Sequence, residues 1–394
     1  MKRVVLLGIV WTLAMAGAGL GQTAKASDRQ RQAALTLEQA GKIPEAEDAW
    51  RAWLKAHPSS PEAYAHLGLL EARQGRYKDA VPLYRKALET GPEVPGLRLN
   101  LGLALFKGGD LKQAAQEFSM MLKNQPGNQQ LTTLLGMAHY GLAEYAEAVP
   151  YLKDAAAHDP QNLPLRLALA HSCLWSRQNQ CVMDVYREIL SLNAESAEAD
   201  MLAGEALDEM KDNEGSTKMF RAAVKANPKE PNAHFGLGYL LWTQKQYKEA
   251  ASEFQAELAN DPDHVQAMLY LGDTSIQLNQ MEDARPLLEK VVKLNPALGL
   301  GHLDLGIVYT EAGRNEDAMR ELALAAKLTP EDVNVHWRLG RLYRAMGKKD
   351  EAKAEFDKAS TLNKAADEDL YKKISNGAAR PAQTPEPAAT PAEK

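Results

Sequence analysis

The chain has 394 residues, 45% of them hydrophobic and 25% charged, with a formal net charge of −6. These proportions are ordinary for a soluble folded protein and exclude a largely disordered or fibrous chain. An acidic chain has no electrostatic reason to bind nucleic acid, so composition argues against that class of partner.

The N-terminus has the pattern of a targeting segment. Lys2 and Arg3 precede a stretch of apolar and small residues over 4–18, and the small-x-small patterns at 19–21 and 24–26 suit a signal peptidase. We expect a signal peptide over residues 1–26, cleaved after residue 21 or 26, and hence a periplasmic or secreted protein. The alternative is an uncleaved inner-membrane anchor, because residues 4–21 approach the length that spans a bilayer.

From residue 27 to residue 366 the sequence repeats with a step of 34. Three residue types hold fixed phases of this step: Gly68, Gly102, Gly136, Gly204, Gly238, Gly272, Gly306 and Gly340; Ala80, Ala114, Ala148, Ala250, Ala284, Ala318 and Ala352; and Pro58, Pro92, Pro126, Pro160, Pro228, Pro262, Pro296 and Pro330. Such a period predicts a solenoid of stacked units. The units are 27–60, 61–94, 95–128, 129–162, 163–196, 197–230, 231–264, 265–298, 299–332 and 333–366.

Each unit has the pattern of two amphipathic helices, A and B. In the second unit, apolar residues recur every three to four positions on both sides of a turn near Gly75. Gly68 and Ala80 are expected to be small because the two helices cross there, and Tyr84 is expected to fill the gap to the following unit. Pro92 falls in the loop, since proline cannot continue a helix.

The repeated residues resemble the tetratricopeptide repeat, with its Leu-Gly-x2-Tyr, Ala-x3-Phe and Pro pattern. The third unit has Leu101, Gly102, Ala114, Phe118 and Pro126, and the tenth has Leu339, Gly340, Tyr343, Ala352 and Phe356. The resemblance implies an all-α fold, a right-handed superhelical α-solenoid of ten helical hairpins. It also implies that the first helix of each hairpin lines a concave groove for a protein partner.

Several units depart from this pattern. The fifth has Ala170, Val182 and Ala194 where Gly, Ala and Pro are expected; the sixth has Ser216 and the seventh Glu257 at positions of small residues. The tenth has Lys364 in place of proline, so its last helix is free to continue. We expect a capping helix over 367–377, and a disordered Pro/Ala-rich tail over 378–394.

Cys173 and Cys181 are the two cysteines, placed symmetrically about the turn of the fifth unit. A helical hairpin brings such positions face to face, and export would place them in an oxidising compartment. Both a disulfide and a pair of buried thiols fit this pattern. A metal site is not expected from two cysteines alone.

No catalytic motif is present: there is no phosphate-binding glycine loop, no His-Glu-x-x-His and no serine elbow. His234, His302 and His336 share one repeat phase and fall in different units, which indicates a structural role. The sequence therefore predicts no enzyme, no cofactor and no metal.

The resemblance assigns inner-surface positions of the first helices to partner binding. These candidate residues are Phe106, Tyr140, Trp175, Glu205, Asp208, Glu209, Phe235, Tyr239, Trp242, Tyr270, Trp337, Arg338, Arg341 and Arg344. Apolar members of this set also suit packing between neighbouring helices, and charged members also suit a solvated face. The convergence of Tyr239, Trp242 and Tyr270 favours contact with a partner.

We therefore expect a non-catalytic, exported adaptor that binds an extended peptide or a helix of a partner protein in the groove. A second hypothesis is a structural scaffold of an envelope assembly for secretion, pili or polysaccharide export, in which the convex face or the ends bind. A third is the regulatory arm of a separately encoded enzyme. Neither nucleic acid nor, after signal cleavage, a membrane span is expected among the contacts of the mature chain.

Overall fold

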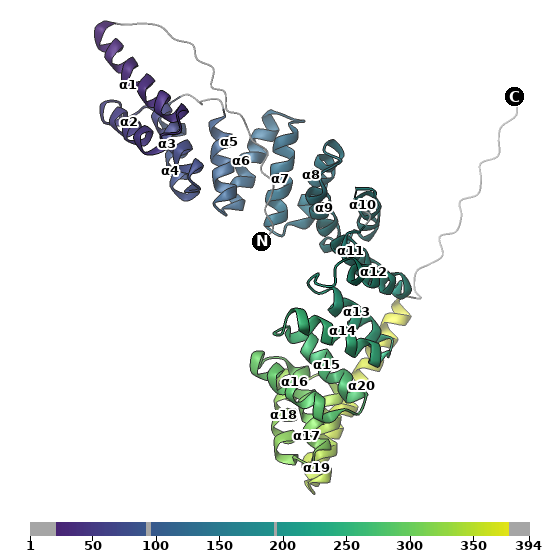
Figure 1. Ribbon diagram of the computed structural model, residues 1–394. Coiled ribbons are helices and arrows are strands. Elements are labelled where there is room, and N and C mark those ends of the chain that lie inside the picture. The colour runs from purple at the N-terminus through teal and green to yellow at the C-terminus, as the bar shows by residue number, and fades with distance from the viewer. Residues whose placement is uncertain (1–20, 92–95, 193–194, 378–394) are drawn as a thin grey trace, which may run out of the picture. The chain divides into compact units, whose positions relative to one another are not determined.

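The computed structural model describes residues 21–91, 96–192 and 195–377, and within these ranges all regular structure consists of twenty α-helices, without strands (Figure 1). The predicted all-α solenoid of helical hairpins is confirmed. The expected disordered tail and most of the expected signal peptide lie outside the described residues. Both predicted cleavage positions fall near the start of the first helix, which begins at Gly21.

The helices form two compact units, residues 1–212 and 213–394, which we describe separately. The first unit contains α1 (Gly21–Gln39), α2 (Ile43–Ala56), α3 (Pro61–Arg73), α4 (Tyr77–Thr90), α5 (Leu97–Lys107), α6 (Leu111–Asn124), α7 (Gln129–Gly141), α8 (Tyr145–His158), α9 (Leu163–Trp175), α10 (Asn179–Leu192) and α11 (Ala197–Glu209).

The second unit contains α12 (Asn213–Ala226), α13 (Ala233–Thr243), α14 (Tyr247–Asn260), α15 (Val265–Gln277), α16 (Met281–Leu294), α17 (Gly299–Glu311), α18 (Asn315–Leu328), α19 (Val333–Ala345) and α20 (Lys349–Gly377). The boundary between the units falls between α11 and α12, inside the sixth predicted hairpin. Sequence periodicity did not predict this division, because the period continues unchanged across it.

The turn between the helices of each hairpin has a left-handed residue at the same repeat position. These residues have positive φ and lie 34 apart: Gly41, Gly75, Gly109, Ala143, Arg177, Lys211, Lys245, Asn279, Gly313 and Gly347. A left-handed residue ends one helix and lets the chain reverse. The middle hairpins make this turn with residues other than glycine, which is why glycine does not mark the period at this position.

Packing inside a hairpin depends on a glycine in the first helix and a large residue sixteen positions later in the second. A Cβ atom added at Gly68 would lie 2.7 Å from the ring of Tyr84, and one at Gly238 would lie 2.8 Å from the ring of Phe254. Tyr84 therefore packs on the glycine of its own hairpin, and it also belongs to a core cluster that includes Leu97 and Leu101 of the next hairpin. In the sixth repeat, the corresponding Phe220 packs against Gly236 of α13.

Side chains cap the start of several first helices. Ser60, Asn128, Asn162 and Ser196 each accept a hydrogen bond from the backbone N–H three residues later, as N-caps do. Where this cap is missing at α13, the buried Glu257 of α14 replaces it. Its carboxylate accepts bonds of 3.1 Å from the backbone N–H groups of both Asn232 and Phe235.

The repeated histidines fasten the two helices of a hairpin to each other. Nδ1 of His234, His302 and His336 lies 2.6 to 2.7 Å from a carboxylate nineteen residues later, on Glu253, Glu321 and Glu355. Nε2 of His302 and His336 also contacts the carbonyl of the loop proline six residues earlier. The expected structural role of these histidines agrees with these contacts.

The last helix is the longest. α20 runs from Lys349 through Lys364 to Gly377, so the segment predicted as a capping helix is its final part. No helix in the described ranges has the length and apolarity that crossing a membrane requires.

Candidate partner-binding surface

The odd-numbered helices line one side of each unit. Odd-numbered helices of successive hairpins contact each other directly, although an even-numbered helix lies between them in the sequence. Such contacts join α13 to α15, α15 to α17, and α17 to α19. In a curved stack the layer with the closest neighbours lies on the inside of the curve. The odd helices therefore form the inner face of each unit, where the resemblance placed the candidate residues.

An aromatic cluster occupies the inner face at α13 and α15. Tyr239 and Trp242 lie nearly parallel to each other, and both meet the ring of Tyr270 edge-on at centroid distances of 5.3 and 5.1 Å. Phe235 contacts Tyr239, Tyr270 and the core residue Phe254. The structure thus brings together the four aromatic residues predicted here, and Tyr239 is 36% exposed.

A carboxylate that sequence reasoning missed holds this cluster in place. Oδ2 of Asp273 accepts a hydrogen bond of 2.5 Å from Nε1 of Trp242, across two neighbouring hairpins. The next inner helix contributes Asp304, which is 2% exposed and whose Oδ2 has no hydrogen-bond partner among the described residues. Burial raises the pKa of Asp304 well above its usual value; the charge of Asp273 adds to the rise, and Arg338 opposes it.

The fourth inner helix of the second unit, α19, has a basic surface. The guanidinium carbon of Arg341 lies 4.7 Å from the ring centroid of Trp337, and that of Arg338 lies 5.8 Å away. Arg344 lies instead over the ring of Phe356 of α20, at 5.5 Å. Trp337 is 42% exposed beneath its two arginines.

The aromatic candidates of the first unit do not form one cluster. Phe106 packs on Phe118 of its own hairpin and is half-buried. Tyr140 and Trp175 meet through Tyr145, the first residue of α8, which lies 6.0 Å from each ring. Trp175 is 63% exposed. It therefore presents a large apolar surface to solvent.

The acidic candidates are on α11. Glu205 and Glu209 are exposed, and Asp208 is half-buried. Glu205 remains open to solvent although many protein atoms surround it. This crowding raises the pKa of its carboxyl group; the charge of His171 opposes the rise and that of Glu209 adds to it. The inner face of the first unit is therefore acidic at its last helix, α11.

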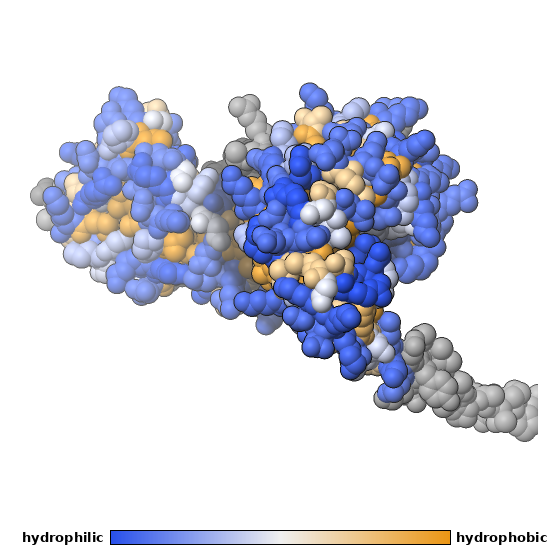
Figure 2. All heavy atoms as spheres, turned by 90° about the horizontal axis from the view of Figure 1, so that it is seen from below, coloured by the Kyte–Doolittle hydropathy of each residue, from blue (hydrophilic) through white to orange (hydrophobic). Residues whose placement is uncertain are grey.

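On the face that Figure 2 shows, apolar surface is divided into patches. Figure 2 shows small hydrophobic areas separated by larger hydrophilic ones on the face in view. A divided surface of this kind suits recognition at separate anchor points more than one broad apolar contact.

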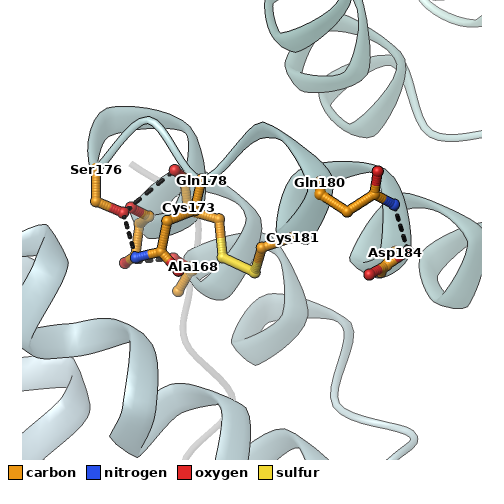
Figure 3. Close-up of a disulfide and its surroundings, with 8 residues drawn as sticks. Ala168, Cys173, Ser176, Gln178, Gln180, Cys181 and Asp184 are labelled. Carbon is orange, nitrogen blue, oxygen red and sulfur yellow. Dashed lines mark hydrogen bonds between the residues drawn. A yellow bond between two sulfur atoms is a disulfide. The ribbon is translucent and has the colours of Figure 1, made fainter. Parts of the chain in front are cut away.

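The two cysteines form a disulfide in the structure. Cys173 at the end of α9 is joined to Cys181 near the start of α10, and Figure 3 shows the bridge closing the turn of the fifth hairpin. Hydrogen bonds from Gln178 to Ser176, and from Ser176 to the carbonyl of Cys173, order the same turn. The bridge lies in the fifth repeat, which lacks the glycine, alanine and proline that recur in the other repeats.

No group of three or more His, Cys, Asp or Glu side chains in the described ranges could hold a metal ion. The geometry thus defines a class: a stack of helical hairpins with an aromatic and charged inner face. The sequence model of the tetratricopeptide repeat matches residues 31–95, 73–129 and 201–264, and a second model of the same repeat matches 241–300, 276–336 and 309–373. The chain belongs to the tetratricopeptide repeat family, whose modules are typically non-catalytic and bind protein or peptide partners.

Solved structures of this fold resemble parts of the chain. MamA is 20% identical, with a TM-score of 0.38, and the match covers 42% of this chain and 96% of MamA. MamA from Desulfovibrio magneticus RS-1 is 22% identical, with 43% and 96% covered and a TM-score of 0.40. YrrB, described as a TPR protein with an unusual peptide-binding site, is 20% identical, with 48% and 97% covered and a TM-score of 0.41. No curated protein matches.

Proposed function

We propose that this protein is an exported, non-catalytic adaptor that holds an extended peptide or a helix of a partner protein against its inner face. The observation that carries the proposal is the cluster of Tyr239, Trp242 and Tyr270. Three aromatic side chains from two hairpins converge there, and Tyr239 remains 36% exposed. Exposed aromatic clusters on soluble proteins are characteristic of binding sites.

The cluster is also organised before any partner arrives. The hydrogen bond from Trp242 to Asp273 fixes the indole, and edge-on contacts with Tyr270 fix the neighbouring rings. An anchor that is already ordered loses little side-chain entropy on binding. Each such aromatic residue would contribute about 1–4 kcal/mol to affinity, as interface hot spots do. In addition, the Cys173–Cys181 bridge suits an oxidising compartment and thus supports export.

A second function has an observation of its own. Met120 of α6, Leu294 of α16 and Leu324 of α18 are large apolar residues that are at least 36% exposed on even-numbered helices. A scaffold of an envelope assembly would use such residues on the outer face. The inner aromatic cluster favours the adaptor, because its side chains converge while these three lie in three different hairpins.

Affinity capture from envelope extract tests the adaptor against the scaffold. The bait is the mature chain, beside a Tyr239→Ala, Trp242→Ala, Tyr270→Ala variant and a control with Met120→Ala, Leu294→Ala and Leu324→Ala. Circular dichroism must show all three to be folded. The adaptor predicts a protein captured by the wild type and the outer-face control and lost on the inner-face variant. Loss on the control alone would contradict it and favour the scaffold.

A further inference from the structure

We propose that Trp337, Arg338, Arg341 and Arg344, here called the arginine surface, bind aspartate or glutamate side chains of the partner. This inference rests on the proposed function and specifies the chemistry of the segment that the second unit binds. It also fixes the spacing between that segment's acidic residues and its apolar anchor.

The three arginines differ from the other arginines in the described part of the second unit. Arg221, Arg285, Arg314 and Arg320 each form an ion pair with a carboxylate. In the part of the second unit that the structure describes, Arg338, Arg341 and Arg344 form none, and Nε of Arg338 is buried without a hydrogen-bond partner. The inner face of α19 thus has three cations at helical spacing with no counter-charge in contact.

Aromatic rings keep these cations in place. Arg341 and Arg338 lie over Trp337, and Arg344 lies over Phe356. A guanidinium that stacks on a ring keeps its N–H edge free, and that edge matches a carboxylate with two parallel hydrogen bonds. Because stacking already restricts these side chains, they lose less conformational entropy than free arginines when they bind an anion.

The surroundings favour single carboxylates over a polyanion. The charge of Glu311 on α17 acts on Arg338, and the whole chain has a net charge of −6. A nucleic acid or an anionic membrane would meet repulsion around the arginines. One or two acidic side chains of a peptide match the small size of the positive area, while the exposed edge of Trp337 offers apolar contact beside it.

The aromatic cluster sets where these acidic residues stand in the partner. Neighbouring packed helices are about 10 Å apart, so α15 and α19, with α17 between them, are separated by about 20 Å. An extended chain advances about 3.3 Å per residue. A segment with an apolar anchor in the aromatic cluster would therefore place its acidic residues about six positions away.

Fluorescence anisotropy with synthetic peptides tests this inference on the full chain. One peptide has a tryptophan and, about six residues further on, two glutamates in a Ser/Ala background; a second has the order reversed. Matched peptides have glutamine, lysine or phosphoserine in place of the glutamates, or have the glutamates next to the tryptophan. We expect one of the two glutamate peptides to bind about tenfold more tightly than its glutamine match, and the lysine peptide to bind weakest.

Protein variants locate the effect. Arg341→Gln and Arg338→Gln should each reduce glutamate-peptide affinity toward that of the glutamine peptide, while Arg285→Gln on α16 should leave it unchanged. Arg341→Glu should shift the preference toward lysine. Equal affinity for glutamate, glutamine and lysine peptides, all lost in the inner-face aromatic variant, would overturn this inference and leave the adaptor function standing.

Two further results would also overturn it. The first is a phosphoserine peptide that binds far more tightly than the glutamate peptide, which would assign the surface to phosphate. The second is binding of none of the peptides. In that last case the capture experiment decides separately whether the adaptor function stands.

Discussion

At the scale of single residues, the recurring glycines mark points where a large side chain of the second helix packs against the backbone of the first helix. The sequence predicts that Gly238 must be small, but not that Phe254, sixteen residues later, is what requires it. The ring lies so close that a single added Cβ atom would be 2.8 Å from it. The identity of the partner depends on how the two helices cross, which periodicity alone does not specify.

Gly238→Ala should lower the free energy of unfolding by about 1–3 kcal/mol, because the added methyl group overpacks the helix crossing. Thermal melting of the chain measures this. Phe254→Leu makes room at the same point, so the double variant should lose less stability than the sum of the single variants. Strict additivity would contradict the assignment of Phe254 as the obstructing side chain.

Glu257 shows how a departure from the repeat can have a local cause. The position belongs to a small residue by the family pattern, yet the structure uses its carboxylate to cap α13, whose start lacks the usual side-chain cap. A buried carboxylate with two backbone donors is a satisfied group. The sequence identifies Glu257 as a departure from the repeat. It does not predict the capping role, because Glu257 is on α14 and the helix that it caps is α13.

Glu257→Ala restores the residue that the family pattern prefers, and it should nonetheless destabilise the chain by about 1–3 kcal/mol. Two backbone N–H groups at the start of α13 lose their acceptor in this variant. Glu257→Gln keeps one acceptor oxygen and should be less damaging. Chemical denaturation of the three proteins compares them; a more stable alanine variant would show that the cap contributes nothing.

At the scale of elements, pairs of polar side chains fasten hairpins that the apolar period assembles. Glu355 of α20 is one such group. Burial opposes its ionisation, but hydrogen bonds from Lys358 and His336 outweigh burial and lower the pKa of its carboxyl group. A carboxyl group with a lowered pKa stabilises the fold above its unfolded pKa, and this contribution is lost as pH falls through the folded value.

The stability difference between the wild type and Glu355→Gln should therefore depend on pH. At a pH above the usual pKa of a glutamate the wild type should melt at the higher temperature. The difference should shrink as pH falls through the lowered pKa of the folded state, because the carboxyl group is then protonated in both states. Melting curves at several pH values measure it. A difference that stays constant over this range would contradict the role given to the ionised carboxylate.

The disulfide belongs to the same scale, because it joins the two helices of the fifth hairpin. Both cysteines should resist alkylation after unfolding without reductant, and reduction should lower the melting temperature. Crosslinks that close short loops contribute about 2–3 kcal/mol. Mass spectrometry that finds two alkylated thiols in the unreduced chain would exclude the bridge.

The helices and turns were the part of this structure that the sequence predicted best. The helices and their turns follow from a local period, so the sequence alone places them. The inner-face candidates follow from the family resemblance, and Tyr239, Trp242 and Tyr270 do converge. Their hydrogen bond to Asp273, the stacking of Arg341 on Trp337 and the orphaned Oδ2 of Asp304 were not predictable, because they depend on rotamers and on contacts between hairpins.

At the scale of the whole molecule, the period predicts ten repeats without a break, and the structure groups the helices into two compact units divided after residue 212. The second unit contains the aromatic cluster, the buried carboxylate and the arginine surface. The central claim of our account is that the inner face of this unit binds the partner. Tyr239 on the inner helix α13 and Leu324 on the outer helix α18 are a matched pair of probes, because both are 36% exposed.

The most direct test replaces either Tyr239 or Leu324 with a photo-crosslinking phenylalanine derivative and irradiates cells that express the protein. Our account predicts a specific adduct of a partner protein at position 239 and none at position 324. It also predicts that Arg341→Gln weakens the adduct at position 239. An adduct at position 324 with none at position 239 would contradict the inner-face account and place the partner on the outer helices.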